Sequence, residues 1–274
     1  MHDSPEIALL RHLFPIGKVA SLREILERTG IKIPEQLSSI RSLEDTGFVF
    51  RRTENEISLA AEPDSLAPQA ISARLHTAAI GRDIVVFRET SSTNDRVRQA
   101  GIFGAREGLA IFAEGQTKGR GTYGRKWVSG PGDGLWFSIL LRSRIEPNEL
   151  PRLVQLAAVA CAEVVERSIG RIVHIKPPND LVLGNGKLAG FLLETSNSWD
   201  FQVLGIGINI RSAPWLPDYP TAAMQQFSMN KISRNALAAE LLDGIEDWYL
   251  NKWGDQVEVA FKSRCIGVAP KVLW

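Results

Sequence analysis

A loop rich in glycine and cations is the first stretch of the sequence that could do chemistry. Residues 115–127 read GQTKGRGTYGRKW and include Lys118, Gly119, Arg120, Arg125, Lys126 and Trp127. Glycine tolerates positive φ, so backbone N–H groups can turn toward an anion, and arginine binds a phosphate or carboxylate through two hydrogen bonds. Trp127 adds a flat face for a planar ring, so the loop fits a nucleotide-like ligand, and it equally fits a solvated surface loop. The spacing matches neither a P-loop nor a dinucleotide fingerprint.

A second cluster, IKPPNDLVLGNGKLAG, spans residues 175–190. Asn179 and Asp180 follow two prolines, and the Asn-Gly pair at 185–186 predicts a hairpin turn that brings Lys187 back toward Asp180. A carboxylate suits a magnesium ion and a lysine suits the charge of a phosphoryl group, so the pair could serve phosphoryl chemistry. A proline-rich turn with a surface Lys–Asp pair is the structural alternative.

Two shorter segments complete the set of candidates. ETSSTND at 89–95 carries Ser92 and Thr93 at an expected strand-to-helix junction, where a hydroxyl can cap the helix or bind a small polar ligand group. GIGIN at 205–209 is a strand with two glycines. Such a strand indicates close approach by a ligand or, alternatively, tight packing of a neighbouring strand.

These segments need a rigid support, and the sequence around them predicts a sheet with a few helices. Runs rich in Val, Ile and Leu indicate strands at 83–90, 109–116, 134–143, 171–176, 180–185, 187–196 and 201–210. Residues 151–170 are expected to form a long, largely buried helix ending at Gly170, and residues 232–253 show amphipathic helical spacing. The fold class is therefore α/β in the broad sense that includes α+β.

Residues 6–60 form a separate small unit in this interpretation. Three helical segments, of which the second is capped by Ser21 and ends at Gly30, precede two short strands around a polar turn at 53–56. Three helices and a hairpin are the order of a small winged helix-turn-helix domain, a pattern that many small domains share. The segment AEPDSLAPQ is polar and rich in proline, so we expect domains at 1–66 and 67–274.

The totals argue against several classes of protein. The 274 residues carry a net charge of +1, so nothing in the overall charge points to nucleic acid or membrane. No apolar run reaches the roughly 18 residues that a membrane span needs, and the first residues lack the pattern of a signal peptide. Cys161 and Cys265 lie far apart without a CxxC spacing, which argues against a zinc site and fits a reducing cytoplasm.

Five segments, in this order, resemble the motifs of biotin protein ligases. Members of that family carry S-T-N at the end of a strand, then Q with GRGRxGRxW, KWPND, KLAG and GxGIN. Here these stand as Ser92-Thr93-Asn94, Gln116 with GRGTYGRKW, KPPND, KLAG and GIGIN. The resemblance runs from about residue 67 to about residue 265, and the N-terminal unit is similar to the winged-helix domain of the longer, two-function members. It implies a mixed-sheet catalytic domain of the biotin/lipoate ligase type.

The resemblance implies a two-step reaction. The carboxylate of biotin attacks the α-phosphate of ATP, giving biotinyl-5'-adenylate and pyrophosphate. A lysine of a biotin carboxyl-carrier protein then attacks the activated carbonyl and releases AMP. The implied cofactors are ATP and Mg²⁺ with biotin as the acyl substrate, and the implied partner is the carrier subunit of an acetyl-CoA carboxylase.

The resemblance also implies roles for single residues. The catalytic residues would be Lys187, Arg120 and Asp180, with Lys187 holding the biotin carboxylate against the α-phosphate and Asp180 placing the metal. The biotin site would consist of Ser92, Thr93, Gln116, Gly119, Arg120, Lys187, Gly190, Leu192 and Gly205, where Gly190 and Gly205 leave room for the bicyclic ring. The nucleotide site would consist of Arg120, Arg125, Trp127, Asn179, Asp180, Lys187 and Asn209, where Trp127 stacks on the adenine and Asn179 contacts adenine or ribose. The glycine loop is then expected to close over the adenylate and exclude water.

Three features depart from the family pattern. Thr122 and Tyr123 replace an arginine pair, and the arginine often found at 122 helps to retain the adenylate phosphate. Pro177 replaces the tryptophan of KWPND, which alters the expected pocket wall. The chain ends at APKVLW where longer members continue, so we expect their C-terminal β-barrel domain to be absent or reduced to its first strand, with weaker engagement of ATP or the carrier.

DNA binding and two other functions stay open. Residues 1–66 hold eight Lys and Arg against eleven Asp and Glu, and the expected recognition helix at 34–46 has Arg41 as its single cation. Arg51 and Arg52 in the wing remain as phosphate contacts, so DNA binding has weak support, while a homodimer would match the two-function members. A lipoate or octanoate ligase of the same fold, and a non-catalytic transcription factor that senses biotinyl-adenylate, are the alternatives.

Overall fold

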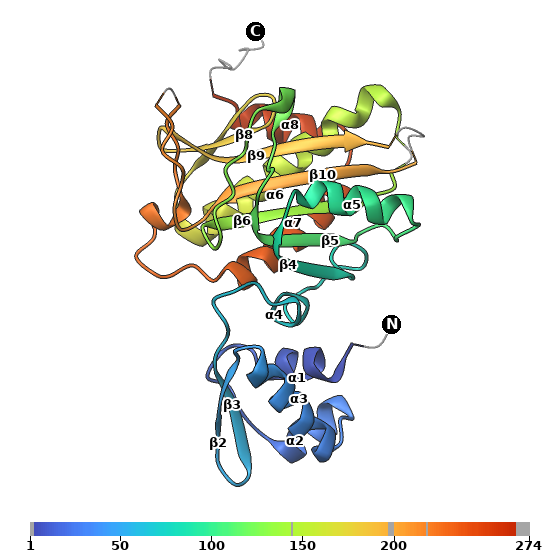
Figure 1. Ribbon diagram of the computed structural model, residues 1–274, viewed down its shortest axis with the longest axis vertical. Coiled ribbons are helices and arrows are strands. Elements are labelled where there is room, and N and C mark those ends of the chain that lie inside the picture. The colour runs from blue at the N-terminus through green and yellow to red at the C-terminus, as the bar shows by residue number, and fades with distance from the viewer. Residues whose placement is uncertain (1–2, 144, 197–199, 218, 267–274) are drawn as a thin grey trace. The chain divides into compact units, whose positions relative to one another are not determined.

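The computed structural model of the chain describes residues 3–143, 145–196, 200–217 and 219–266. It divides into two compact units, Met1–Leu75 and His76–Trp274 (Figure 1). Residues 269–274, where the first strand of a further domain was expected, lie outside the described residues. Within the described part, no helix is both long enough and apolar enough to cross a membrane.

The N-terminal unit follows the expected order of three helices and a hairpin, with one short strand added between the first two helices. Its elements are α1 (Pro5–Leu13), β1 (Val19–Ser21), α2 (Leu22–Thr29), α3 (Ile33–Asp45), β2 (Val49–Arg52), β3 (Glu56–Ala61) and α4 (Pro68–Ser72). The sheet is antiparallel with the order β1-β3-β2. Ser21 caps α2 by accepting a hydrogen bond from the backbone N–H of Glu24, and Gly30 ends this helix in the left-handed conformation.

This unit extends beyond the boundary expected near residue 66. Helix α4 packs against α1, and the guanidinium of Arg11 donates hydrogen bonds to the carbonyls of Ser72 (3.1 Å) and Ala73 (3.4 Å). Ala70 is fully buried in the same core. The proline-rich segment is therefore folded as part of the N-terminal unit, because its helix supplies apolar area to that core.

A seven-stranded mixed sheet of order β4-β5-β6-β10-β9-β8-β7 supports the C-terminal unit. Its strands are β4 (Ile84–Thr90), β5 (Ala110–Gln116), β6 (Gly134–Leu141), β7 (Val173–Lys176), β8 (Asp180–Leu183), β9 (Gly186–Thr195) and β10 (Gln202–Asn209). Strands β4 and β5 are parallel, and the other neighbouring pairs are antiparallel. The mixed α/β class expected from the sequence is confirmed.

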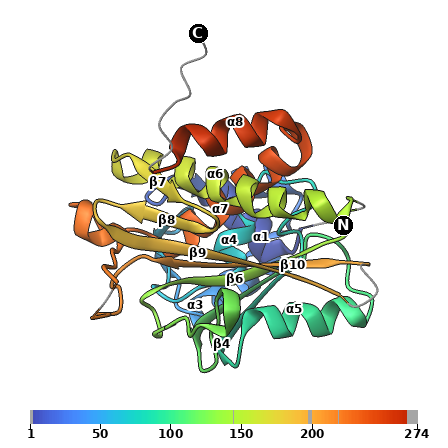
Figure 2. The same cartoon turned by 90° about the horizontal axis from the view of Figure 1, so that it is seen from above.

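Helices cover both faces of this sheet, as Figure 2 shows. Helices α6 (Leu150–Ile169), α7 (Arg234–Asn251) and α8 (Asp255–Arg264) lie on one face, and α5 (Thr93–Ile102) lies on the other. Short 3₁₀ segments complete the unit at Thr122–Gly124, Pro147–Glu149 and Met224–Phe227. The central strands β6 and β10 are buried at every position, so they give the loops at their ends a rigid base.

The hairpin between β8 and β9 differs from the expected turn. The sequence favoured Asn185-Gly186 as its loop, but Gly186 already pairs with Leu183, so the two-residue loop consists of Gly184 and Asn185. Gly184 supplies the positive φ of 59° that a tight hairpin loop needs. The shifted loop still returns Lys187 to β8, so the expected approach of the two strands is confirmed.

Candidate active site

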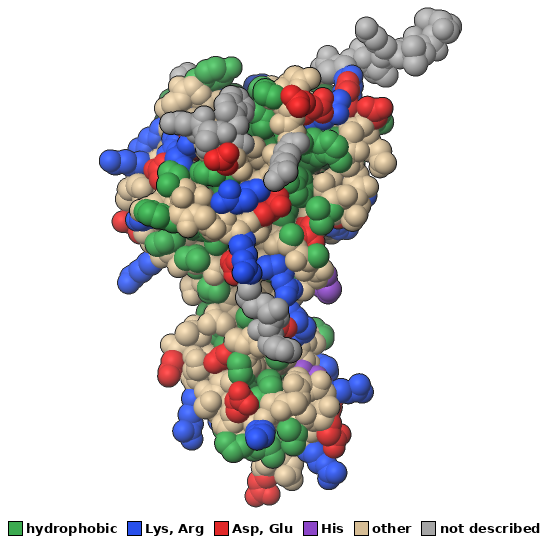
Figure 3. Space-filling view, turned by 90° about the vertical axis from the view of Figure 1, so that its right-hand side faces the viewer, with side chains coloured by type: hydrophobic (Ala, Val, Ile, Leu, Met, Phe, Trp, Pro, Cys, Tyr) green, Lys and Arg blue, Asp and Glu red, His purple; other side chains and the backbone are tan. Residues whose placement is uncertain are grey.

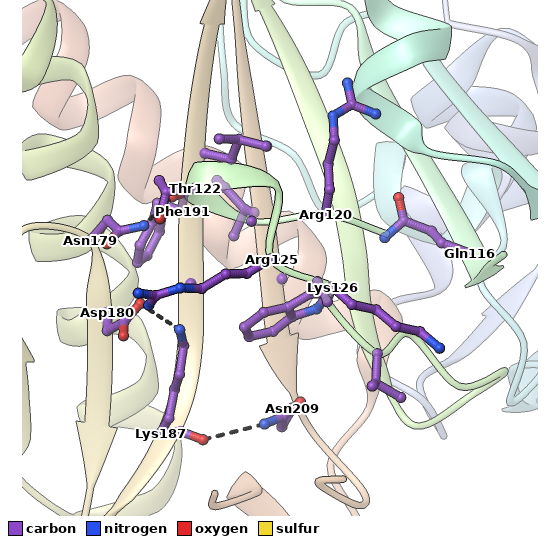
Figure 4. A pocket seen from close by; sticks show the side chains of 18 of the residues that line it. Gln116, Arg120, Thr122, Arg125, Lys126, Asn179, Asp180, Lys187, Phe191 and Asn209 are labelled. Atoms are coloured by element: carbon purple, nitrogen blue, oxygen red, sulfur yellow. Dashed lines mark hydrogen bonds and ion pairs between the residues drawn. The ribbon is translucent and has the colours of Figure 1, made fainter. Parts of the chain in front are cut away.

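A cavity of about 440 Å³ in the C-terminal unit brings all five motif segments together. The expected site residues that line it are Ser92, Thr93, Gln116, Arg120, Arg125, Trp127, Asn179, Asp180, Lys187, Gly190, Leu192, Gly205 and Asn209. Figure 4 labels Gln116, Arg120, Arg125, Asn179, Asp180, Lys187 and Asn209 among them. Of the expected residues, Gly119 lies outside this lining. A Cβ atom at Gly119 would stand 2.5 Å from the carbonyl oxygen of Trp127, so this glycine lets the two arms of the loop approach each other.

Lys187 and Asp180 form an ion pair inside the cavity, with 2.7 Å between Nζ and Oδ1. Lys187 pairs with Val182 across the ladder, so it shares a face of the sheet with Asp180, two residues earlier on β8. The two side chains are 22% and 15% exposed, which shields the pair from bulk water and strengthens its attraction. The ammonium also lies 5.2 Å from the ring centre of Trp127, within cation–π range.

A second lysine and a tyrosine extend this ion pair. The hydroxyl of Tyr219 donates to Asp180 Oδ2 at 3.3 Å, and Lys176 Nζ donates to the same hydroxyl at 3.0 Å. The hydrogen bond with Tyr219 raises the pKa of Lys176 above its usual value, so this lysine is charged at neutral pH. Arg125 of the glycine loop extends toward the cluster in Figure 4. Among the described residues of this cluster, the cations outnumber the one carboxylate, so this end of the cavity attracts anions.

Hydroxyl and amide side chains form a buried hydrogen-bond network in another part of the lining. Gln116 Oε1 accepts from the backbone N–H of Thr93 at 2.8 Å. The hydroxyl of Thr93 lies 2.7 Å from that of Ser138, which donates to Asn94 Oδ1 at 2.6 Å. Ser92 is buried at the start of α5, yet its hydroxyl makes no capping hydrogen bond. Helix capping therefore does not account for Ser92, and the network presents fixed polar groups to the cavity.

Trp127 lies on the bare backbone of two neighbouring strands. A Cβ atom at Gly207 would stand 2.5 Å from Trp127 Nε1, and one at Gly190 would stand 3.0 Å from its Cζ3. A Cβ atom at Gly205 would collide with the amide oxygen of Asn94. Gly190 and Gly205 admit side chains of the protein itself, and the room they were expected to leave for a ligand ring stays a prediction. The glycines thus set the depth at which the indole and the amide can sit.

Arg120 lines the cavity, but its guanidinium points away from Lys187 (Figure 4). It lies between two carboxylates, 2.8 Å from Asp95 and 2.8 Å from Glu194. Burial alone would lower the pKa of Arg120, but hydrogen bonds to both carboxylates raise it above the ordinary value, so the charge is permanent. Two acidic neighbours thus hold this cation in the structure, and the expected role of Arg120 toward biotin and the nucleotide stays a prediction.

The two asparagines expected in a nucleotide site both donate hydrogen bonds to backbone carbonyls of the protein. Asn179 Nδ2 donates to the carbonyl of Phe191 at 2.7 Å, and Asn209 Nδ2 donates to the carbonyl of Ala222 at 3.1 Å. The amide oxygen of Asn209 is buried without a hydrogen-bond partner among the described residues. The contact of Asn179 with adenine or ribose stays a prediction, since its amide nitrogen already has a partner.

Comparison with known proteins identifies the family that carries these motifs. Residues 86–210 match the Biotin/lipoate A/B protein ligase family. The Bifunctional ligase/repressor BirA of Escherichia coli (strain K12) is 31% identical over 253 residues, which cover 88% of this chain and 76% of that protein. The chain belongs to the biotin protein ligase family.

Other members of the family cover the chain in part. The Bifunctional ligase/repressor BirA of Bacillus subtilis (strain 168) is 32% identical over 200 residues, or 70% of this chain, and the match spans 61% of that relative's length. The Biotin--[acetyl-CoA-carboxylase] ligase of Mycobacterium tuberculosis (strain ATCC 25618 / H37Rv) is 28% identical over 225 residues, covering 76% of this chain and 82% of that protein. A solved biotin protein ligase from Aquifex aeolicus in complex with biotin and ATP matches with a TM-score of 0.60 and 26% identity, covering 68% of this chain and 79% of that chain.

Asn94, Lys176, Tyr219 and Glu194, which contact other residues of the site, are among those that were not singled out from the sequence. Asn94 and Lys176 stand inside the S-T-N and KPPND motifs of the biotin protein ligases, so a signal for both was present. Tyr219 lies in an irregular segment before the last two helices, and Glu194 stands near the end of β9 outside every motif. Their contacts join segments far apart in the chain, which no local pattern reveals.

Asp180 is the carboxylate that fits the metal expected for a biotin protein ligase. The described residues contain no group of three or more His, Cys, Asp or Glu side chains that could hold a metal by themselves. In nucleotide sites Mg²⁺ is commonly held by one or two carboxylates together with the phosphates of the substrate. One carboxylate beside a cationic cluster therefore fits an ion that arrives with the nucleotide.

Proposed function

We propose that the chain activates biotin with ATP to biotinyl-5'-adenylate and transfers the biotinyl group to a lysine of a biotin carboxyl-carrier protein. One observation carries the proposal: a single cavity contains both the hydroxyl–amide network and the Lys187–Asp180 pair. The network suits the polar ureido ring of biotin, and the cationic cluster suits a carboxylate and a triphosphate. Relatives named as biotin ligases, and the Aquifex aeolicus structure with biotin and ATP, support the same reaction.

Charge repulsion is the main obstacle to the first step, because both reactants are anions. The ammonium of Lys187 is shielded from bulk water and can contact the biotin carboxylate and the α-phosphate together. Asp180 holds the ammonium in place before the substrates arrive, so little reorganisation is needed. A carboxylate oxygen then forms a bond to the α-phosphorus while the bond from that phosphorus to the bridging oxygen breaks, and pyrophosphate leaves.

Other residues of the cavity hold the substrates in this proposal. Ser92, Thr93 and Gln116 bind the ureido group, Trp127 stacks on the adenine, and Arg125 contacts the phosphates. Mg²⁺ supplies neutralisation of the phosphate charge when it is bound, with Asp180 as its protein ligand. In the second step the amine of the carrier lysine attacks the activated carbonyl and AMP leaves. During this reaction the loop at 117–128 excludes water from the adenylate. Thr122 stands in place of an arginine, which weakens the retention of the adenylate in the site.

A labelling assay tests the proposal. The purified chain is incubated with ATP, Mg²⁺, a carrier domain and either biotin or lipoate, and the carrier is probed for biotinyl and lipoyl groups on blots. We expect the biotinyl label alone. A lipoyl label alone reassigns the chain to the lipoate or octanoate ligases of the same fold. No label with either acid, together with no biotin-dependent exchange of pyrophosphate into ATP, overturns the ligase proposal.

Ligand-dependent DNA binding by the N-terminal unit is a second candidate. The helix order of this unit and the relatives named ligase/repressor favour it. The charges oppose it, because Arg52 of the wing pairs with Glu44 of α3, which neutralises one of the few expected phosphate contacts. On the face that Figure 3 shows, basic and acidic side chains of this unit are interspersed rather than gathered into a patch.

Selection from a pool of random DNA duplexes, with and without biotinyl-5'-adenylate, separates the two candidates. Enrichment of a sequence only in the presence of the adenylate supports ligand-dependent DNA binding, and no enrichment under either condition overturns it. Glu44→Ala releases Arg52, so we expect it to raise non-specific DNA affinity at low salt.

A further inference from the structure

Glu194 stands where the glycine loop, α5 and β9 meet. Its Oε2 accepts hydrogen bonds from Asn94 Nδ2 at 2.8 Å and from Arg120 Nη2 at 2.8 Å. Its Oε1 accepts from Arg120 Nε at 3.2 Å and from Nη2 at 3.1 Å. One carboxylate therefore holds a residue of the S-T-N turn and a residue of the loop at the same time.

Glu194 is the less exposed of the two carboxylates that contact Arg120. The Glu194 side chain is 22% exposed and that of Asp95 is 47% exposed, although both carboxylates lie 2.8 Å from the guanidinium. Water screens the more exposed carboxylate more effectively. Contacts from both Nε and Nη2 also fix the plane of the guanidinium on Glu194, which a single contact cannot do.

The same carboxylate sets the orientation of Asn94. An asparagine amide has one donor end and one acceptor end, and Glu194 accepts only from the donor end. The amide oxygen must then face Ser138, whose hydroxyl donates to it at 2.6 Å and lies 2.7 Å from the hydroxyl of Thr93. Glu194 thus fixes the direction of a chain of hydrogen bonds that ends at a cavity-lining hydroxyl.

We propose that Glu194 is a positioning residue, which fixes the loop at 117–128 through Arg120 and the cavity-lining turn through Asn94. The consequence for catalysis rests on the proposed ligase function, but the consequence for the loop does not. Without Glu194, Arg120 keeps only the exposed Asp95 of these two carboxylates, and both ends of the Asn94 amide become interchangeable.

Amide hydrogen exchange of the full-length protein without ligand tests the consequence for the loop, which is the structural half of the proposal. We expect Glu194→Gln to accelerate exchange at residues 117–127 and 92–94 at least about tenfold, because a charge-assisted contact is lost. Exchange in β10 and α6 stays unchanged. Glu240→Gln makes the same change at an exposed position of α7 and is expected to alter neither region. Unchanged exchange at 117–127 in Glu194→Gln overturns the proposal.

Two further variants change Arg120 and its other carboxylate partner, Asp95, instead of Glu194. Arg120→Lys removes the two-point contact with Glu194 but keeps the hydrogen bond between Asn94 and Glu194. Amide exchange should therefore rise at residues 117–127 and stay slow at residues 92–94. Asp95→Asn should have the smaller effect on the loop. A larger effect from Asp95→Asn than from Glu194→Gln contradicts the assignment, and this comparison remains available if Glu194→Gln fails to fold.

Steady-state kinetics test the consequence for catalysis, which is the catalytic half of the proposal. We expect Glu194→Gln to raise the KM for biotin in pyrophosphate exchange several-fold and to change the melting temperature little. A lower KM for biotin means that Glu194 competes with the substrate carboxylate for Arg120, and this overturns the positioning role. Absence of exchange in the wild-type protein overturns the ligase proposal instead, and the hydrogen-exchange comparison then still decides the structural half.

Discussion

At the scale of the residue, the cations of the cavity differ in what already holds them. Arg120 is shared by two carboxylates, while Lys187 faces one carboxylate and the ring of Trp127. The sequence predicted the Lys187–Asp180 contact because one tight hairpin joins their strands. It could not predict the partner of Arg120, because Glu194 lies 74 positions further along the chain. The sequence thus predicted which side chains could take part in chemistry, but it did not predict which of them pair across long stretches of the chain.

Lys187 is the residue whose loss should stop the first step. We expect Lys187→Met to lower biotin-dependent pyrophosphate exchange by about two orders of magnitude or more, since one preorganised charge in a site is worth that much. The substitution also removes the ion-pair partner of the largely buried Asp180 carboxylate, so we expect unfolding to become easier by about 1–3 kcal/mol. Lys262→Met, on α8, is the matched control and should retain wild-type exchange. Exchange near the wild-type rate in Lys187→Met removes this lysine from the chemistry.

Trp127 should matter more for the nucleotide than for biotin. We expect Trp127→Ala to raise the KM for ATP about tenfold or more, because stacking of a base on an aromatic ring contributes about 1–3 kcal/mol. Trp127→Phe keeps a flat ring and should lie close to the wild-type protein. Initial rates of pyrophosphate exchange at varied ATP and at varied biotin measure the two constants. Equal losses for both substrates argue against stacking on the adenine.

At the scale of the element, the strands were well predicted and the turn between β8 and β9 was not. Each strand contains several of the residues Val, Ile, Leu and Phe or lies close to turn residues, which is a strong local signal. The turn has three adjacent candidate residues, Gly184, Asn185 and Gly186, and the choice depends on which register pairs β8 with β9. Register is decided by the pairing of whole strands, so the dipeptide preference alone gave the wrong loop.

The glycines of β9 and β10 make a prediction that belongs to the sheet. Gly207→Ala adds a methyl group 2.5 Å from Trp127 Nε1, so the indole has to move, and we expect a lower kcat/KM for ATP with the fold preserved. In a Trp127→Ala background, Gly207→Ala should have little further effect. A full additional loss there shows that the glycine acts through something other than the indole.

At the scale of the whole molecule, the order of the two units was predictable and the place where one ends was not. Proline and polar residues at 61–69 favoured a boundary near 66, but buried Ala70 and the contacts of Arg11 draw α4 into the N-terminal core. The order of three helices and a hairpin needed only local signals, whereas the boundary depended on packing between α1 and α4. The cytoplasmic location and the homodimer stay predictions from the sequence.

Truncation at two positions tests this division. We expect residues 76–274 to fold alone and to keep pyrophosphate exchange within a few-fold of the full chain, because this unit has its own core and cavity. A chain of residues 67–274 keeps α4 without α1, exposing apolar side chains, so it should aggregate more readily. Size-exclusion chromatography and the exchange assay compare the two. Loss of activity in 76–274, with a normal melting curve, shows that the N-terminal unit takes part in catalysis.

The position of Trp127 has a practical consequence. Its indole lies 5.2 Å from the ammonium of Lys187 and makes an edge-type contact with Trp136, with 6.3 Å between ring centres. A charge and a second indole so near make its emission sensitive to any molecule that enters the cavity beside it. The difference in fluorescence between the native protein and Trp127→Phe therefore provides an intrinsic optical probe, with which cavity occupancy can be titrated without attaching a dye.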